Sequence, residues 1–170
     1  IGIIFLIDYL DDTIKTPDQV LEDTDLTTLG AIAIIKQSDD NNSLITQSAP
    51  RDPISEAYRV IRTNLDFSSV DEELTSFLVS SASPGEGKST TAANLAIVIA
   101  QTGKKVVLID ADLRRPVQHK IFNLSNNMGL TTTILDNQTP VFTHLQGTKI
   151  TNLQLLTSGP IPPNPAELLN

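Results

Sequence analysis

Cysteine is absent from all 170 residues, and so is tryptophan. Without cysteine the chain cannot build a disulfide framework, a thiolate zinc site or a cysteine nucleophile. The cell compartment stays open on this ground alone. Aromatic residues make up only 4% of the chain, but apolar residues make up 39% and there are 8 glycines. That content is typical of a globular chain rather than a disordered one.

Basic residues are also scarce: 12 Lys and Arg stand against 20 Asp and Glu, a net charge of −8. This balance argues against binding nucleic acid through bulk electrostatics. We therefore expect no nucleic-acid partner. The charge is uneven, since residues 1–50 hold nine acids and two lysines (net −7) and the rest holds eleven acids and ten bases (net −1). The length fits one domain with a short appendage.

Long hydrophobic runs are missing, and the apolar stretch at residues 1–7 (IGIIFLI) is too short to span a bilayer, which takes about 20 residues. No basic region marks a signal peptide. The stretch fits a buried core segment or the end of a transmembrane helix. Asp8, Asp11 and Asp12 follow it, where the positive-inside rule favours Lys or Arg. Because the chain starts inside an apolar run without methionine, we expect a fragment.

Capping residues and apolar spacing predict the elements of the first third. Thr16-Pro17-Asp18 predicts a helix to about Asp25, and residues 29–35 suggest a strand. Residues 37–52 are polar and predict a surface loop that contains a domain boundary. Asp52-Pro53 predicts a second helix. Its apolar stripe comprises Ile54, Tyr58, Ile61 and Leu65.

From residue 75 onward the pattern becomes strand, loop, helix and strand. Residues 77–79 form a short apolar run, and residues 92–100 are apolar nearly all round, as in a buried helix. Residues 106–109 (VVLI) are typical of a buried parallel strand. Further on, residues 153–156 suggest another strand, followed by a proline-rich loop and a helix starting near residue 166. The predicted unit is βαβ.

The segment Ser81–Thr90 (SASPGEGKST) lies between the first apolar run and the buried helix. Its Ala82-x-x-x-x-Gly87-Lys88-Ser89 part matches the P-loop pattern, except that alanine replaces the first glycine. Such a loop binds phosphate through backbone N–H groups and a helix N-terminus. A glycine-containing turn that only connects two elements is the alternative. The pattern predicts that Lys88 reaches the β- and γ-phosphates and that Ser89 ligates Mg²⁺.

Two aspartates follow the strand at 106–109, in the sequence VVLIDADLRRP. Open α/β sheets bind ligands at the carboxyl ends of their strands. On an extended chain, Asp110 and Asp112 would point the same way. One could hold Mg²⁺ through water while the other orients a nucleophile or accepts its proton. Arg114 is expected to bind phosphate or to pair with a carboxylate.

These two motifs, followed by HKIF, GLTTTIL and LLTSGPIPPNPAELL, resemble the bacterial tyrosine kinases of capsular and exopolysaccharide synthesis. Those enzymes are P-loop proteins similar in fold to the Min and Par ATPases. The upstream segments IDYLDDTIKTPDQV and LGAIAI resemble the region after the second transmembrane helix of single-chain polysaccharide co-polymerases fused to such a kinase. The resemblance covers nearly the whole chain, most strongly residues 50–170.

The resemblance implies an α/β fold of the P-loop NTPase class, with a mostly parallel sheet, helices on both faces and a truncated C-terminus. It assigns residues 1–10 to the end of a transmembrane helix, 11–50 to a juxtamembrane linker and 51–170 to the N-terminal part of a kinase domain. The protein would then sit in the bacterial inner or plasma membrane, with its catalytic domain in the cytoplasm.

The implied reaction transfers the γ-phosphate of ATP, with Mg²⁺, to a tyrosine of a neighbouring chain. The implied catalytic residues are Lys88, Asp110 and Asp112, and the implied metal ligands are Ser89, Asp110 and Asp112. Polysaccharide synthesis and export machinery and a tyrosine phosphatase are the implied partners. The residues implied to hold the nucleotide are Gly85, Glu86, Gly87, Lys88, Ser89, Thr90 and Arg114.

The family also has an E-x-x-R-x-x-R helix that assembles a ring of subunits, and Glu56, Arg59 and Arg62 match it. On a helical wheel they fall roughly 80–200° from the apolar stripe. They are therefore expected to face away from the core and to meet a neighbouring subunit in a homo-oligomer. The alternative is a solvated charged face with a weak Glu56–Arg59 pair.

Three departures from the family pattern limit the prediction. Ser83 occupies the place where partition ATPases carry a signature lysine. The sequence ends at Asn170, before the positions where the family has its Walker B aspartate and its C-terminal tyrosine cluster. The two tyrosines present, Tyr9 and Tyr58, do not match that cluster. The fragment is therefore expected to be catalytically incomplete. A Min/Par-type ATPase switch and a non-catalytic ATP-binding scaffold for chain-length control stay open as alternatives.

Overall fold

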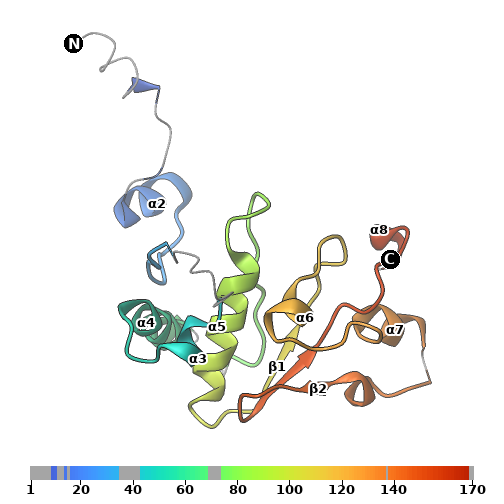
Figure 1. The fold of residues 1–170 in the computed structure, drawn as a ribbon. Helices are drawn as coiled ribbons and strands as arrows, with labels where there is room; N and C mark the ends of the chain where they lie inside the picture. The colour runs from blue at the N-terminus through green and yellow to red at the C-terminus, as the bar shows by residue number, and fades with distance from the viewer. Residues whose placement is uncertain are drawn as a thin grey trace.

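The computed structural model describes residues 9–10, 14, 16–34, 43–68, 74–136 and 138–168 (Figure 1). The predicted end of a transmembrane helix at residues 1–10 lies almost wholly outside them. Across these described ranges, none of the helices has the length and apolar character that a membrane crossing requires.

A three-stranded sheet forms one side of the domain (Figure 1). Its strands are β1 (Val106–Ile109), β2 (Gln146–Gly147) and β3 (Leu153–Leu156), in the order β1-β3-β2. β1 and β3 run parallel, whereas β2 pairs antiparallel with β3. Two of the strands predicted from apolar runs, β1 and β3, are present, and the sheet is mixed. β1 is not buried on both faces as predicted, because its side chains alternate between the core and solvent and Val107 and Ile109 are 46% and 51% exposed.

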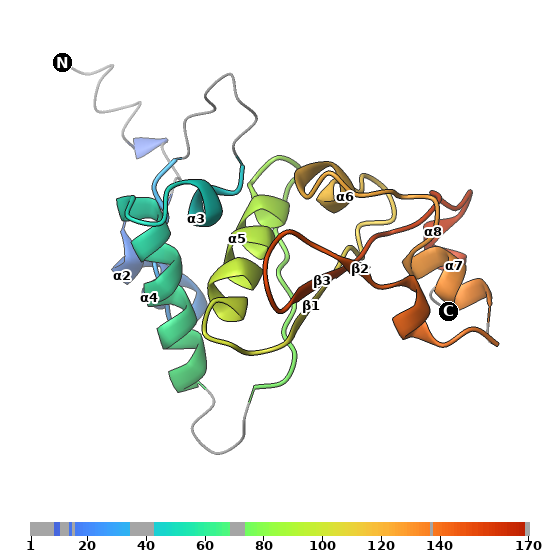
Figure 2. The same ribbon diagram turned by 60° about the horizontal axis from the view of Figure 1, so that its bottom comes forward.

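The helix α5 (Lys88–Ala100) lies between the sheet and α4 (Pro53–Ser68), as Figures 1 and 2 show from two directions. It buries residues on both sides, which explains its almost wholly apolar sequence. One side packs on the sheet through Ala93, Ala96, Ile97 and Ala100, against Phe122, Leu153 and Leu155. The other packs on α4 through Leu95 and Val98, against Tyr58 and Ile61.

The capping residues confirm two of the predicted helices. Asp52 accepts a 2.7 Å hydrogen bond from Ile54 N at the start of α4. Thr16 and Gln19 form a reciprocal capping box at the start of α2 (Pro17–Thr24). These local side-chain bonds satisfy backbone N–H groups that the first turn of a helix leaves unpaired.

The polar segment predicted as a surface loop at residues 37–52 contains a short helix, α3 (Ile45–Ser48). Thr46 in this helix is fully buried, and Asn94 of α5 accepts hydrogen bonds from its N–H and its hydroxyl at 3.0 and 2.8 Å. The Asn94 amide also donates to the Ser43 carbonyl at 2.7 Å. Residues 43–46 are therefore packed on α5 rather than exposed to solvent throughout.

Two predicted strands do not form in the described residues. Residues 77–79 have no assigned structure, and Leu78 is 83% exposed, because no described strand pairs with them. Residues 29–34 are irregular as well, and Ile35 lies outside the described residues. This segment contacts helices instead of pairing as a strand. Ile32 packs against α4 and α5, and the Leu29 carbonyl accepts a hydrogen bond from Asn64 of α4.

The remaining described elements are α6 (Gln118–Ile121), α7 (Leu130–Leu135), a 3₁₀ helix η1 (Val141–His144) and α8 (Pro165–Leu168). The proline-rich loop predicted after β3 is present. Asn126 holds the start of this loop through two hydrogen bonds. The side-chain amide of Asn126 accepts from Gly159 N at 3.0 Å and donates to Gly159 O at 2.8 Å. α8 begins within one residue of the predicted position, and Leu169 lies outside the described residues.

Candidate functional site

The P-loop connects residues 74–81 to α5. Gly85 and Gly87 have φ angles of 87° and 86°, in the left-handed region that favours glycine. Gly87 is the N-cap of α5, and no side chain caps that helix end. The N–H groups of the first turn therefore keep their donors for an anion. No atom lies within 4 Å of a Cβ placed at either glycine, so conformation alone explains the residue type.

Side chains inside the P-loop hold its shape. Glu86 accepts a 3.0 Å hydrogen bond from Ser83 N, and the Ser81 hydroxyl donates to Ser83 O at 3.0 Å. Glu86, one of the predicted nucleotide-binding residues, thus contacts its own loop. Thr90, another of them, is half-buried in the first turn of α5, where its carbonyl accepts from Asn94 at 2.9 Å.

An ion pair joins the two predicted motifs: Lys88 Nζ lies 2.9 Å from Asp112 Oδ2. The side chains are 33% and 21% exposed. Hydrogen bonding to Lys88, and then to the N–H of Arg115, holds the pKa of Asp112 below its ordinary value. The structure therefore brings the P-loop lysine and an aspartate that follows β1 to one place.

Asp110, 5% exposed, sits directly after β1 and is surrounded by backbone donors. Its Oδ2 accepts from Val117 N at 3.1 Å and Gln118 N at 2.9 Å, and its Oδ1 accepts from Asp112 N at 3.2 Å. Burial raises the pKa of this carboxyl, although the three N–H groups oppose the rise.

The expectation that Asp110 and Asp112 point the same way assumed an extended chain, which the structure does not have. The bond from Asp112 N to Asp110 Oδ1 closes a turn immediately after the strand. A second turn follows, because Asp112 Oδ1 accepts from Arg114 N and Arg115 N at 3.2 and 2.9 Å. Asp110 consequently faces α6, Asp112 faces Lys88, and Arg114 is exposed.

Gln118, the first residue of α6, is a site neighbour that the sequence prediction missed. Its Nε2 donates to the Ser89 carbonyl at 2.9 Å, while its backbone N–H binds Asp110. The side chain is almost fully buried, and its Oε1 has no hydrogen-bond partner. The sequence carries no local signal for this contact, because the partners are 29 and 8 residues away.

The donor set fits a magnesium ion. Ser89 offers a hydroxyl and the two aspartates offer carboxylates, the hard oxygen ligands that Mg²⁺ prefers. In the described part of the chain, no three His, Cys, Asp or Glu side chains cluster as a complete metal site. In proteins Mg²⁺ is usually held by one or two carboxylates together with substrate phosphates and water.

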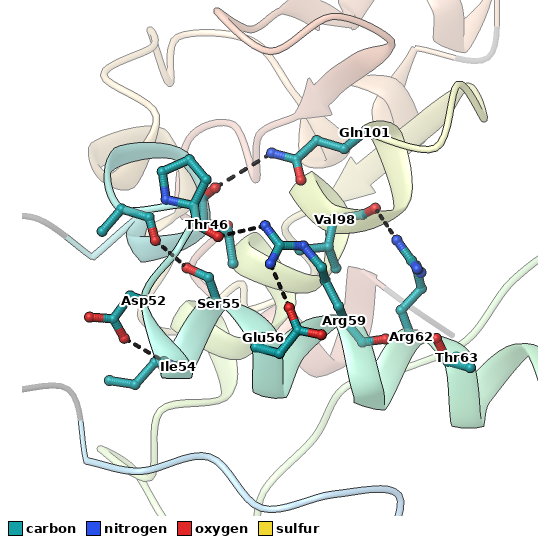
Figure 3. Close-up of polar contacts among 12 residues, drawn as sticks. Thr46, Asp52, Ile54, Ser55, Glu56, Arg59, Arg62, Thr63, Val98 and Gln101 are labelled. Carbon is teal, nitrogen blue, oxygen red and sulfur yellow. Dashed lines mark hydrogen bonds and ion pairs between the residues drawn. The ribbon is translucent and has the colours of Figure 1, made fainter.

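The predicted oligomerisation residues lie on α4 and contact their own chain (Figure 3). Arg59 donates to Glu56 at 2.8 Å and to the Pro50 carbonyl at 2.7 Å. Arg62 is half-buried and donates to the Val98 carbonyl in the last turn of α5 at 3.3 Å. The expectation that all three face away from the core therefore fails for Arg62, whose side chain is long enough to reach α5.

Comparisons with known proteins show that the chain is similar to bacterial tyrosine-protein kinases. It is 54% identical over 128 residues to the tyrosine-protein kinase YwqD of Bacillus subtilis, covering 75% of this chain and 54% of that protein. It is 44% identical over 126 residues to the putative tyrosine-protein kinase CapB of Staphylococcus aureus, covering 74% and 55%. The chain thus spans about half the length of the curated relatives it matches.

Solved structures agree. The chimerical protein CapA2B2 superposes with a TM-score of 0.81 at 44% identity, over 91% of this chain and 65% of that one. The kinase domain of the Escherichia coli tyrosine kinase ETK superposes with a TM-score of 0.80 at 30% identity, over 92% and 65%. The ParA family model, described as NUBPL iron-transfer P-loop NTPase, matches residues 74–160. The predicted α/β P-loop fold and the resemblance are confirmed: the chain belongs to the ParA family of P-loop NTPases, and its homologues are bacterial tyrosine-protein kinases.

Proposed function

We propose that this chain holds ATP with Mg²⁺ at the P-loop, as part of a protein-tyrosine kinase that regulates capsular or exopolysaccharide synthesis. The ion pair between Lys88 and Asp112 carries the proposal, because it joins the P-loop to the acidic loop after β1 at 2.9 Å. A glycine-containing turn that merely connects two elements would not need a half-buried lysine paired with that carboxylate.

Each part of the site has a proposed task. The uncapped N-terminus of α5 and the N–H groups of the P-loop bind phosphate oxygens. Lys88 stabilises the charge on the β- and γ-phosphates. Ser89 and the two aspartates, Asp110 and Asp112, would hold Mg²⁺, directly or through water. When bound, Mg²⁺ would neutralise negative charge on the phosphates.

The proposed reaction breaks the bond between the γ-phosphorus and the bridging oxygen of ATP and forms a bond from that phosphorus to a tyrosine oxygen. ADP leaves, and the proton of the tyrosine hydroxyl passes to a carboxylate. One of the two aspartates, Asp110 or Asp112, is proposed to accept it while the other holds the metal.

The acceptor tyrosine is proposed to belong to a neighbouring chain. Tyr58 is only 1% exposed in the core between α4 and α5, so it cannot enter an active site of the folded protein. We assign the contact between chains to the outer face of α4, where Glu56 has a 65% exposed side chain and Val60 is 46% exposed. A homo-oligomeric ring would bring the site of one subunit to its neighbour.

Two other functions are less well supported. The iron transfer named in the family description is not carried over, since these 170 residues hold no cysteine to ligate iron through a thiolate. A Min/Par-type switch is disfavoured because the relatives at 54% and 44% identity are tyrosine kinases. The proposed setting is the bacterial plasma membrane with a cytoplasmic catalytic domain, where export machinery and a tyrosine phosphatase are the partners.

The test compares Lys88→Met with Lys149→Met in the full-length protein. Lys149 is exposed in the turn before β3 and gives a matched loss of one lysine. Phosphotyrosine formed with Mg²⁺ and ATP is measured by immunoblot, and nucleotide binding by calorimetry. Lys88→Met is expected to abolish phosphotyrosine, while Lys149→Met retains it. Undiminished phosphotyrosine in Lys88→Met would overturn the assignment of the P-loop as the catalytic phosphate site.

A further inference from the structure

One residue of α6 contacts both halves of the proposed nucleotide site. Through its backbone N–H, Gln118 donates to Asp110 Oδ2 at 2.9 Å. Through its side-chain Nε2, it donates to the Ser89 carbonyl, also at 2.9 Å. Ser89 is the second residue of the P-loop helix α5, whereas Asp110 follows β1. Gln118 therefore bridges two residues that belong to different elements and are both proposed magnesium ligands.

We propose that Gln118 is a positioning residue that fixes the Ser89 hydroxyl relative to the Asp110 carboxylate for binding of Mg²⁺ with the nucleotide. It touches neither phosphate nor metal in this role and acts through the two residues that it bridges. The inference rests on the proposed function, since it assumes that Ser89 and Asp110 share a magnesium ion. No comparison with other proteins assigns a role to this position.

Burial gives the bridge its precision. Gln118 is 4% exposed, so packing restricts its side chain; its bond to Asp110 is buried and its bond to Ser89 is partly buried. Mg²⁺ demands nearly ideal octahedral geometry at about 2.0–2.1 Å, so a small displacement between two of its ligands weakens binding. A bridge of two hydrogen bonds from a buried residue is the kind of support that such a site needs.

The unpartnered oxygen of Gln118 points to a ligand. A buried amide oxygen that accepts no hydrogen bond costs free energy. Native structures rarely contain such an oxygen unless water, an ion or a functional role accounts for it. Gln118 Oε1 is such an atom. It belongs to the same amide group as the Nε2 that donates to the Ser89 carbonyl, so we assign it as an acceptor for a water molecule that accompanies the metal.

The experiment measures how much Mg²⁺ improves ADP binding in the full-length protein. Calorimetry with ADP is performed with Mg²⁺ and with a chelator, and the ratio of the two affinities is compared among variants. Gln118→Met keeps the side-chain length and removes both amide atoms. Gln118→Asn keeps the amide but is one methylene too short to bridge. The matched control is Gln146→Met, because Gln146 of β2 also donates to a backbone carbonyl at 2.9 Å, that of Ser125.

Both Gln118 variants are expected to lower the Mg²⁺-dependent gain in ADP affinity by about threefold to tenfold, the worth of a typical hydrogen bond, with affinity in chelator nearly unchanged. Gln146→Met should keep the full gain. Equal losses with and without Mg²⁺, an unchanged gain, or variants too unstable to titrate would each overturn the positioning role. If the unsubstituted protein shows no Mg²⁺-dependent ADP binding, the proposed function itself fails.

Discussion

Lys88 and Asp112 form an ion pair of 2.9 Å between the first residue of α5 and the loop after β1. The ammonium that the P-loop pattern assigns to the phosphates is thus held by a carboxylate of the same site. Phosphate and Asp112 are both anionic partners for that one group, so nucleotide binding must either share Lys88 or displace Asp112. The pair couples the geometry of the acidic loop to the occupancy of the P-loop.

The ion pair predicts an acid-sensitive contribution to stability. The folded pKa of Asp112 lies below its ordinary 3.8, so its ionised form is stabilised by folding. This contribution is fully present above that value and is lost as pH falls through the folded pKa. Asp112→Asn should lower the unfolding free energy by about 0.5–1 kcal/mol at neutral pH, because both partners are partly exposed.

Urea unfolding of both proteins across the acidic range checks this prediction. Asn keeps the Oδ1 that accepts from Arg114 and Arg115, so the comparison isolates the charge. The difference between wild type and Asp112→Asn should shrink as the solution becomes more acidic than pH 3.8. A difference that stays constant with pH would mean that Lys88 does not lower the pKa of Asp112.

Asn94 is predicted to be the polar anchor of α3. It accepts from Thr46 N and Oγ1 and donates to Ser43 O, all with little exposure. Asn94→Ala should destabilise the protein by about 1–3 kcal/mol, since it leaves the buried Thr46 N–H unsatisfied. Asn127→Ala, at an exposed asparagine in the segment between α6 and α7, should change stability by less than about 0.5 kcal/mol. If thermal unfolding shows the same loss of stability in both variants, the prediction that Asn94 anchors α3 is wrong.

Gly129 is predicted to be intolerant of any side chain. A Cβ placed on it would lie 2.1 Å from the Thr157 carbonyl oxygen, a backbone atom that cannot swing aside. Gly129→Ala should therefore cost about 1–3 kcal/mol, the usual range for overpacking. The control is Gly147→Ala, where nothing lies within 4 Å of the added carbon. Chemical denaturation of both variants measures the contrast, and similar midpoints would argue against this close approach.

Arg62 is predicted to act in folding as well as in any assembly of subunits. It donates to Val98 O at the C-terminus of α5, where a cation also interacts favourably with the helix dipole. Arg62→Ala should lower stability by about 1 kcal/mol, whereas Glu56→Gln, at an exposed pair, should change it by less than about 0.5 kcal/mol. Light scattering measures assembly separately. Glu56→Gln is the cleaner test of the ring, and unchanged assembly would leave α4 without that role.

The sequence predicted the elements whose signals are local. The capping box of Thr16 with Gln19, the Asp52 cap and the apolar run of α5 each lie within the element that they specify. The P-loop and the aspartates after β1 were predicted for the same reason. The contact between them, from Lys88 to Asp112, joins residues 24 positions apart and is a finding of the structure.

Features that depend on distant partners could not be predicted. A strand exists only beside another strand, so the apolar residues 77–79 alone could not guarantee one. α3 is only 4 residues long and depends on Asn94, which lies 48 residues beyond Thr46. Gln118 carries no motif. Arg62 was misplaced because a helical wheel records the direction of Cβ and ignores the reach of a long side chain.

Because α5 supplies buried residues to both apolar clusters, the two layers around it need not open together. Detachment of α4 would expose Leu95 and Val98, yet Ala93, Ala96 and Ile97 would stay packed on the sheet. Amide hydrogen exchange should then resolve two cooperative units, with the α4 amides exchanging through a smaller opening than those of β3. α5, the helix that follows the P-loop, would then stay packed on the sheet after the loss of the helix proposed to recruit a neighbouring subunit.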